Sequence, residues 1–324
     1  MTPPHQILIG DCIESMRSLP DKSVQCCVTS PPYYGLRDYG VGGQIGLEET
    51  PAEFISKLIA VFAEVRRVLR DDGTAWVNMG DSYSRDKQLM MMPARLAIAM
   101  QDDGWYLRQD IIWNKQNPMP ESVRDRCTKS HEYIFLLSKK RNYYFDQQAI
   151  TEPLTQSSVD RLAQAGWEEQ QGSDRVPGKT NGAMKAVGGL RSKRNSFSRE
   201  TKATAGEHGQ SAQHRPGRDD IDYDQSRNKR SVWTVATARF KGAHFATFPP
   251  DLIRPCILAG SPRGGVILDP FGGAGTTGMV AMQEGRRSLL CELNPDYAAL
   301  ARARLDQAWI DGAAQLDIFK DSAA

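Results

Sequence analysis

Cysteine and histidine, which build zinc sites and disulfide frameworks, are scarce in this sequence. Its 324 residues include six cysteines and five histidines, and no two cysteines form a C-x-x-C pair. Zinc sites and disulfide scaffolds place these residues at short, regular spacings. The sequence therefore predicts neither a metal site nor disulfides, and the isolated cysteines favour a cytoplasmic protein.

Long apolar runs and a strong excess of one charge are also missing. No stretch reaches the roughly 18 to 20 apolar residues of a membrane span. The first ten residues lack the basic start and apolar run of a signal peptide. Lys and Arg number 41 against 39 Asp and Glu, a formal net charge of +2. We expect no membrane partner, and any basic surface for nucleic acid must be local.

The pattern of apolar residues divides the chain into three stretches. Residues 1–150 and 241–324 alternate strand-like and helix-like segments, whereas 151–240 are polar and rich in Gly, Ser, Gln, Lys and Arg. Such alternation predicts an α/β fold with a Rossmann-like, mostly parallel sheet and helices on both faces. Strands are expected at 23–29, 74–79, 106–113, 132–137, 142–145, 265–268 and 288–292, with 132–137 and 142–145 as a candidate hairpin. Helices are expected at 93–101, 250–259 and 276–283, and from Asn294 onward.

One helix start has three agreeing signals. Thr50 can cap the helix, Pro51 suits its first position, and Glu53 completes a capping box. Apolar residues follow at helical spacing from Phe54 to Leu69, and Asp71-Asp72-Gly73 is the expected stop.

A glycine-rich turn, DPFGGAGTTG, occupies residues 269–278 between an expected strand and helix. Gly273, Gly275 and Gly278 match the G-x-G-x-x-G spacing that brings backbone N–H groups close to a ligand. A turn that merely needs glycine, or a dinucleotide site, would look the same. Two acids narrow the choice: Asp269 can bind an amino group, and Glu292 can accept both ribose hydroxyls of an adenosine. A dinucleotide pyrophosphate would be repelled by Asp269.

A second turn, TSPPYY at residues 29–34, directly follows the expected strand 23–29. Pro31 and Pro32 fix φ and remove two N–H donors, so the carbonyls of Ser30 and Pro31 face outward. With the Ser30 hydroxyl they form a set of acceptors for an –NH2 group, and Tyr33 offers a flat face for a planar ring. This set suits the exocyclic amine of a nucleobase, which must leave the duplex to reach such a pocket.

A different reaction on a nucleobase, methylation of carbon 5 of cytosine, would need a cysteine nucleophile, usually after a proline, instead of acceptors for an amine. Pro255-Cys256 occurs here, within the apolar pattern of the expected helix 250–259. A cysteine in that pattern is typical of a core residue.

The two turns together resemble the β group of DNA amino-methyltransferases, which are permuted so that the catalytic motif precedes the cofactor motif. TSPPY at 29–33, a long insertion, and DPFGGAGTT at 269–277 follow that order. The resemblance implies three parts: a catalytic half at 1–150, a target-recognition insertion at 151–240 and a cofactor half at 241–324. It implies S-adenosylmethionine as cofactor, with residues 9–11 at its adenine and 244–249 at its methionine end. Residues 113–125 and 131–137 resemble family segments that line the base pocket.

The resemblance assigns two sets of residues. Those expected to hold the target amine are Ser30, Pro31, Pro32 and Tyr33. Those expected to hold the cofactor are Asp11, Phe245, Asp269, Pro270, Phe271, Gly273, Gly275, Thr276, Thr277, Glu292 and Asn294. In this family the motif S-P-P-Y usually accompanies methylation of cytosine N4, whereas D-P-P-Y usually accompanies methylation of adenine N6. Ser30 therefore favours cytosine as the target base, and adenine is the alternative.

The expected partner is double-stranded DNA, and a restriction endonuclease is a further candidate. The protein itself is expected to be a monomer or a homodimer. Residues 175–202 carry eight Lys or Arg against one acid, which fits either a phosphate-tracking element or a solvated loop. The loop Gly35–Gly46 is a candidate cover for the flipped base, with Arg37 as a candidate phosphate or base contact. A non-catalytic DNA-binding module and an RNA or protein methyltransferase are the other readings.

Overall fold

A computed structural model describes residues 5–155, 226–237 and 248–321, with the side chains of the last helix described to residue 310. The chain divides into two compact units. The first comprises residues 1–150 and 230–324, and the second residues 151–229. In the second unit, β6 (Glu152–Pro153) pairs antiparallel with β7 (Ser226–Arg227).

The first unit is built on an eight-stranded sheet with the order β1-β10-β9-β2-β3-β5-β4-β8. Its strands are β1 (His5–Ile9), β2 (Val24–Thr29), β3 (Leu69–Met79), β4 (Tyr106–Lys115), β5 (His131–Ser138), β8 (Val232–Val235), β9 (Val266–Asp269) and β10 (Arg287–Glu292). Every neighbouring pair is parallel except β5 with β3 and β5 with β4. The predicted α/β fold with a mostly parallel sheet is confirmed.

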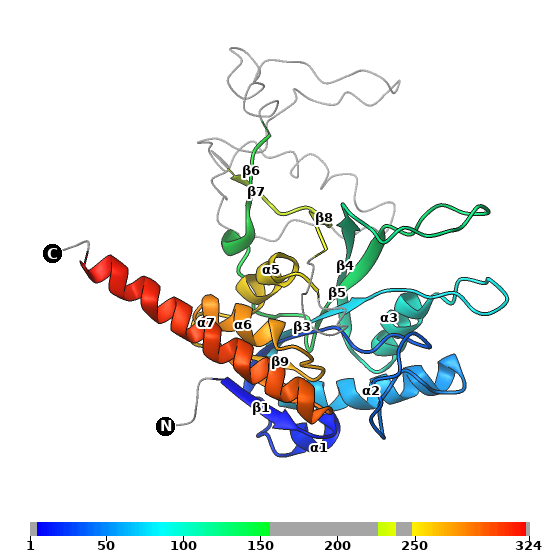
Figure 1. Cartoon of the computed structure of the whole chain (residues 1–324), viewed down its shortest axis with the longest axis horizontal. Coiled ribbons are helices and arrows are strands. Elements are labelled where there is room, and N and C mark those ends of the chain that lie inside the picture. The colour runs from blue at the N-terminus through cyan, green and yellow to red at the C-terminus, as the bar shows by residue number, and fades with distance from the viewer. Residues whose placement is uncertain (1–4, 156–225, 238–247, 322–324) are drawn as a thin grey trace, which may run out of the picture. The chain divides into compact units, whose positions relative to one another are not determined.

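Helices cover both faces of this sheet (Figure 1). One layer contains α1 (Cys12–Arg17), α2 (Pro51–Val68) and α3 (Met92–Asp102), and the other contains α5 (Pro250–Gly260), α6 (Thr276–Gln283) and α7 (Pro295–Asp321). Neighbouring residues of one strand point to opposite layers, since Cys27 packs in the core under α2 whereas Cys26 packs in the core under α5. The sheet is therefore buried on both faces, which explains why its central strands read as nearly continuous apolar runs.

Helix α2 begins as its sequence predicts. The Thr50 hydroxyl accepts a hydrogen bond from Glu53 N, and the Glu53 carboxylate accepts one from Thr50 N. Its end differs from the expectation, because the helix stops at Val68 and Leu69 already has extended backbone angles. Leu69 pairs with Val24 of β2, and the register then shifts so that Cys26 pairs with Thr74. Residues 70–73 form a bulge in β3 instead of a separate turn.

Other expected elements differ in a way that the sheet explains. The predicted strand 142–145 is wrong: these residues form no strand, although Tyr144 N donates a hydrogen bond to Asp72 O at 2.8 Å. Strand β5 is already paired with β3 and β4, so it has no free edge for a hairpin partner. Strands β1 and β8 and helix α1 were not predicted, and β8 lies within the stretch expected to be an insertion.

The strand order creates one crevice at the carboxyl ends of the parallel strands. Strands β9 and β2 are neighbours, but the chain leaves β9 toward β10 and leaves β2 toward β3, on the other side. The connections therefore diverge at this point of the sheet, which is where open α/β sheets bind ligands. The glycine-rich turn follows β9 and the proline turn follows β2, so both turns border the same crevice.

Candidate functional site

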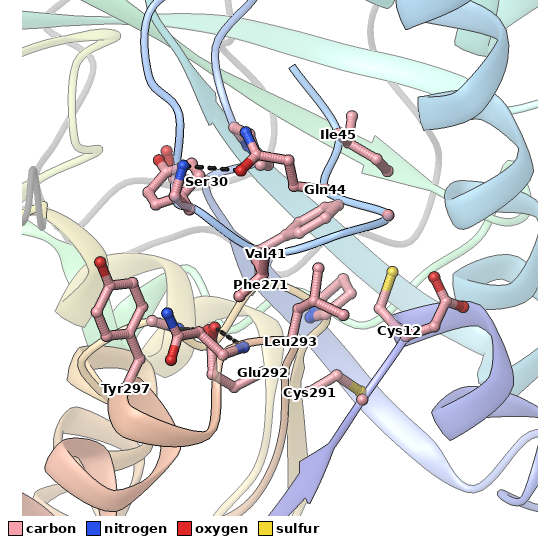
Figure 2. A pocket seen from close by; sticks show the side chains of 18 of the residues that line it. Cys12, Ser30, Val41, Gln44, Ile45, Phe271, Cys291, Glu292, Leu293 and Tyr297 are labelled. Atoms are coloured by element: carbon pink, nitrogen blue, oxygen red, sulfur yellow. Dashed lines mark hydrogen bonds between the residues drawn. The ribbon is translucent and has the colours of Figure 1, made fainter. Parts of the chain in front are cut away.

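A pocket lies in this crevice, at the carboxyl ends of β1, β10, β9 and β2. Figure 2 shows Ser30 and Gln44 across the pocket from Glu292 and Tyr297. The residues that line it are Gly10, Asp11, Cys12, Ser30, Pro32, Tyr39, Val41, Gly43, Gln44, Ile45, Pro270, Phe271, Gly273, Ala274, Cys291, Glu292, Leu293, Asn294 and Tyr297. Residues of the two turns, about 240 positions apart in sequence, thus line one cavity.

The glycine-rich turn owes its shape to two glycines in the left-handed backbone region. Gly273 has φ of 50° and Gly275 has φ of 75°. At Gly275 a Cβ would also lie 2.9 Å from the Cβ of Ala301 in α7, so a side chain would push that helix away. Gly275 therefore serves close packing of the turn against α7, whereas Gly273 lines the pocket.

Asp269 ends β9 beneath this turn and is 2% exposed. Its Oδ1 accepts hydrogen bonds from the Thr29 hydroxyl at 2.6 Å and from Phe271 N at 3.0 Å, and its Oδ2 accepts one from the Thr277 hydroxyl at 2.6 Å. Burial raises the pKa of Asp269 to about 6, although these three hydrogen bonds favour the ionised form. The carboxylate joins the end of β2 to the start of α6 and does not line the pocket. An amino group could use only its remaining lone pair.

Glu292 ends β10 and faces the pocket. Its Oε2 accepts a hydrogen bond from Gly273 N at 2.7 Å, and its Oε1 accepts one from Asn294 N at 2.9 Å. Burial raises its pKa, while these backbone donors oppose the shift. Each oxygen keeps a second lone pair, so the fixed carboxylate can accept two neighbouring hydroxyl groups. This is the arrangement that a ribose requires.

Asp11 and Asn294 combine a local role with a place in the pocket wall. The Oδ1 of Asp11 accepts hydrogen bonds from Ile13 N and Glu14 N and thereby caps α1. The side chain of Asn294 accepts one from Asp296 N at 2.9 Å at the start of α7. The two bonds that Asp11 makes use the same oxygen, so its Oδ2 can meet a ligand in the pocket.

The proline turn contributes Ser30 and Pro32 to the pocket, whereas Pro31 is buried and Tyr33 lies behind the lining. The ring of Tyr33 packs on the backbone of Gly80, where a Cβ would lie 2.7 Å from the ring. The Tyr33 hydroxyl donates a hydrogen bond to Glu132 Oε2 at 2.7 Å. This hydrogen bond anchors the tyrosine by its hydroxyl end.

The loop 35–46 covers the pocket from the proline-turn side. Gly35 N donates to Gly46 O at 2.8 Å, which closes the loop at its base. Inside the loop, the side chain of Gln44 accepts a hydrogen bond from Tyr39 N and donates one to Arg37 O. The ring of Tyr39 meets that of Tyr297 edge to face, with centroids 6.5 Å apart. The loop was expected as a cover for a flipped base, and a nucleic-acid contact by Arg37 stays a prediction.

The structure brings together only part of the predicted set. Ser30 and Pro32 of the catalytic set line the pocket with six of the cofactor set: Asp11, Pro270, Phe271, Gly273, Glu292 and Asn294. Asp269, Gly275, Thr276 and Thr277 lie behind it as buried supports, and Thr277 does so through its bond to Asp269. Phe245 and the basic stretch 175–202 lie outside the described residues. The contacts of all these residues with a cofactor or base remain predictions.

Sequence reasoning did not single out Tyr39, within the expected covering loop, and it missed Tyr297. It also named no individual polar residue behind Tyr33, although Lys115 and Glu132 lie in the segments 113–125 and 131–137 that resemble family segments of the base pocket. Glu132, at the start of β5, accepts hydrogen bonds from Asn78 Nδ2 at 2.9 Å and Lys115 Nζ at 2.5 Å as well as from Tyr33. A signal was available, because a glutamate two residues before the buried apolar run 134–137 breaks the pattern of that strand.

Three expectations from the sequence concern Cys256, a metal site and a membrane span. Cys256, on the buried face of α5, is 1% exposed and packs in the core against the sheet, as expected of a core cysteine. Among the described residues, no group of three or more His, Cys, Asp or Glu could hold a metal ion. No helix in the same residues is long and apolar enough to cross a membrane.

An α/β sheet with a glycine-turn pocket at its switch point, and a second turn of hydrogen-bond acceptors opening into it, defines a Rossmann-like α/β protein with a ligand site at the carboxyl ends of its strands. The DNA methylase family matches residues 24–303. The chain belongs to this family of DNA methylases.

Curated relatives agree with this assignment. The Type II methyltransferase M.XycI of Xanthomonas campestris pv. cyanopsidis is 41% identical over 324 aligned residues, which cover 91% of this chain and 86% of the relative. The Type II methyltransferase M.SmaI of Serratia marcescens is 38% identical and covers 93% of this chain and 90% of the relative.

Solved structures share the fold. The PvuII DNA methyltransferase, described as cytosine-N4-specific, superposes with a TM-score of 0.62 at 19% identity and covers 94% of this chain and 87% of its own. TTHA0409 of Thermus thermophilus, titled a putative DNA modification methylase, was solved with S-adenosyl-L-methionine. It superposes with a TM-score of 0.56 at 24% identity, and the match covers 94% of this chain and 95% of the neighbour. The predicted family of DNA amino-methyltransferases is confirmed.

Proposed function

We propose that this chain transfers a methyl group from S-adenosylmethionine to the exocyclic N4 of a cytosine in duplex DNA. One observation carries the proposal: the acceptor turn at Ser30 and the glycine-rich turn at Phe271 and Gly273 line the same pocket. A methyl transfer needs donor and acceptor held within contact of each other, and this crevice provides one wall for each.

The pocket residues fit the cofactor that the family uses. Glu292 supports the ribose through both carboxylate oxygens, and the rings of Tyr39, Phe271 and Tyr297 provide aromatic surface for a nucleoside. S-adenosylmethionine supplies an electrophilic sulfonium methyl when it is bound. The Thermus thermophilus methylase, which shares this fold, was solved in complex with the same cofactor.

The proline turn acts on the target amine. The lone pair of an exocyclic amine is drawn into the aromatic ring, so the nitrogen is a poor nucleophile. Acceptors on the turn, the Ser30 hydroxyl and the carbonyls of Ser30 and Pro31, bind the amine hydrogens and return density to the nitrogen. The residues position and polarise the amine, and none of them forms a covalent bond to the base.

Cytosine is favoured over adenine by Ser30 in the first position of the turn. The PvuII enzyme, a fold neighbour, is cytosine-N4-specific, which supports the same base. Adenine is the second candidate, because its N6 amine presents the same two hydrogens to the same acceptors. The base must be extruded from the duplex, at a cost of a few kcal/mol. The Type II names of the relatives make a restriction endonuclease a candidate partner.

The experiment is methyl transfer from radiolabelled S-adenosylmethionine to unmethylated DNA by the purified chain. Nucleoside mass spectrometry of the product, with single-molecule sequencing, identifies the base and its context. We expect N4-methyldeoxycytidine in one sequence context. N6-methyldeoxyadenosine would move the assignment to the second candidate, and unmodified DNA with bound cofactor would refute the proposed function.

Ser30→Ala tests the role of the turn. We expect transfer to fall by about tenfold or more, the loss of one hydrogen bond in the transition state, with cofactor affinity nearly unchanged. The matched control is Ser23→Ala, since Ser23 stands at the opposite end of β2 and its hydroxyl bonds only locally, to Pro20 O. Equal losses in the two variants would contradict a specific role for Ser30.

A further inference from the structure

Two loops leave the sheet on the same edge as the proline turn, and the proposed chemistry does not use them. They are residues 80–91, between β3 and α3, and residues 116–130, between β4 and β5 (Figure 1). Strands β2, β3 and β4 run in one direction, because β2 is parallel to β3 and β5 is antiparallel to both β3 and β4. Their carboxyl ends therefore share one edge of the sheet, from which both loops and the proline turn project.

The two loops brace each other. The guanidinium of Arg126 lies over the ring of Tyr83, 4.1 Å from its centroid. The Nζ of Lys129 donates a hydrogen bond to the carbonyl of Asp81 at 2.5 Å. Each of these contacts joins one loop to the other, so the pair projects as one supported structure.

The 116–130 loop is also fixed where it leaves the sheet. Thr237 N donates a hydrogen bond to Asn117 Oδ1 at 2.8 Å, and Lys115 Nζ donates one to Glu132 Oε1 at 2.5 Å. Glu132 Oε2 accepts a further bond from the Tyr33 hydroxyl at 2.7 Å. The loop thus starts from the same carboxylate that anchors Tyr33, which gives it a fixed place beside the proline turn.

Met119 stands on this loop between two prolines. Its side chain is 86% exposed, the largest exposed fraction among the large apolar side chains of the described residues. Pro118 and Pro120 fix their own φ angles, and each restricts the backbone of the residue before it. A single exposed apolar side chain is common on protein surfaces. This one is held on a stiff, anchored segment on the edge that carries the pocket.

Two cations share these loops with Met119. Arg85 of the 80–91 loop and Arg124 of the 116–130 loop are exposed, and neither forms an ion pair with a residue that the structure describes. Guanidinium groups suit phosphate oxygens, which they bind with two donors at once. An apolar side chain accompanied by available guanidinium groups matches the surface of a nucleic-acid duplex, where phosphates border a stack of bases.

We infer that Met119 is a wedge that enters the base stack of duplex DNA while the target base is extruded, with Arg85 and Arg124 on neighbouring phosphates. The inference rests on the proposed function, because a base that leaves the stack for the pocket leaves a gap behind it. Methionine is among the apolar side chains that occupy separated base steps. A stiff loop rooted beside the proline turn can hold the stack open while the extruded base lies at Ser30.

Met119→Ala tests the wedge on two forms of one duplex that carries the recognised sequence. In the first form the target base is paired, and in the second it is mispaired and costs less to extrude. We expect kcat/KM on the paired duplex to fall about 10- to 100-fold, the factor for burial of one apolar side chain. On the mispaired duplex the loss should stay within about threefold, since less of the extrusion cost remains. Cofactor Kd should not change, because Met119 does not line the pocket.

Met119→Leu and Ile98→Ala are the matched variants. Leucine keeps an apolar side chain of similar volume, so kcat/KM should stay within about threefold on both duplexes. Ile98 is 58% exposed on α3, away from both loops, and its removal tests the loss of an exposed apolar side chain elsewhere. Ile98→Ala should match the unaltered protein on both duplexes.

Arg124→Gln tests the phosphate contact that accompanies the wedge. A phosphate contact does not depend on base pairing, so DNA binding should weaken equally for the paired and mispaired duplexes. The slope of log affinity against log salt should fall by about one phosphate contact. An unchanged salt dependence would remove Arg124 from the DNA surface and overturn that part of the inference.

Three results would overturn the wedge itself. The first is an unchanged kcat/KM of Met119→Ala on the paired duplex. The second is an equal loss on the two duplexes, which would assign Met119 to binding or to the shape of the loop. The third is a loss in Met119→Leu as large as that in Met119→Ala. Failure of the proposed function is a separate outcome, because the unaltered protein would then methylate neither duplex.

Discussion

Asp269→Asn should change how the stability of this protein depends on pH. Burial raises the pKa of Asp269 from 3.8 to about 6 in the folded state. A carboxyl with a raised pKa binds its proton more tightly in the folded chain than in the unfolded chain. The stability that it contributes is therefore complete below pH 3.8 and is lost as the pH rises to about 6. At about 1.4 kcal/mol per pKa unit, the loss between about pH 4 and about pH 7 is roughly 3 kcal/mol.

Asparagine is nearly isosteric and carries no charge, so the variant lacks this loss. Its Oδ1 can accept from Phe271 N and from the Thr29 hydroxyl, and the Thr277 hydroxyl can rotate to accept from its Nδ2. Urea unfolding at pH values from about 4 to about 7 should show the variant gaining about 3 kcal/mol relative to the unaltered protein as pH rises. The contributions of the other carboxyl groups to the pH dependence are the same in both proteins, so they cancel in that difference. Asp102→Asn, at the exposed end of α3, is the control for removing one negative charge.

A constant stability difference between Asp269→Asn and the unaltered protein across this range would refute the reasoning. It would mean that the hydrogen bonds from Thr29, Thr277 and Phe271 compensate fully for burial, and that Asp269 is ionised at no cost.

Three further variants test other parts of the structure. Glu292→Gln should weaken cofactor binding by about tenfold in calorimetry, because its amide would face Gly273 N or Asn294 N. Unchanged affinity would remove Glu292 from the ribose site. Cys256→Ala should keep methyl transfer while lowering the free energy of unfolding by about 1 kcal/mol, and a folded but inactive variant would instead indicate a cysteine nucleophile. Thr50→Ala should cost about 1 kcal/mol by loss of the capping box, measured by urea unfolding, with activity per folded molecule unchanged; no change in stability would contradict a contribution from the cap.

Local chemistry made part of this protein predictable from its sequence. The capping box of α2 depends on Thr50 and Glu53, three residues apart, and it forms as expected. The glycine-rich turn needs positive φ at Gly273 and Gly275, which glycine alone adopts readily. Both turns were placed at strand ends because the apolar runs before them stop there.

Predictions failed where the answer depended on which strand lies beside which. Residues 142–145 have strand-like composition, but β5 was already paired on both sides. Val232–Val235 lies in a polar stretch, yet it adds to the edge of the main sheet beside β4. A four-residue strand is stabilised by its neighbour, and its own sequence carries little signal.

The sequence by itself determined the two turns, their order along the chain and the fold class, because these follow from the backbone preferences and side-chain chemistry of adjacent residues. Only the tertiary structure decided which partners surround them. The placement of antiparallel β5 between β3 and β4 brings Glu132 to Tyr33, 99 positions away in the sequence. The packing of β9 against β2 buries Asp269 under Thr29. Strand order is a property of the whole chain, since the place of each strand in the sheet depends on how all the other strands are paired.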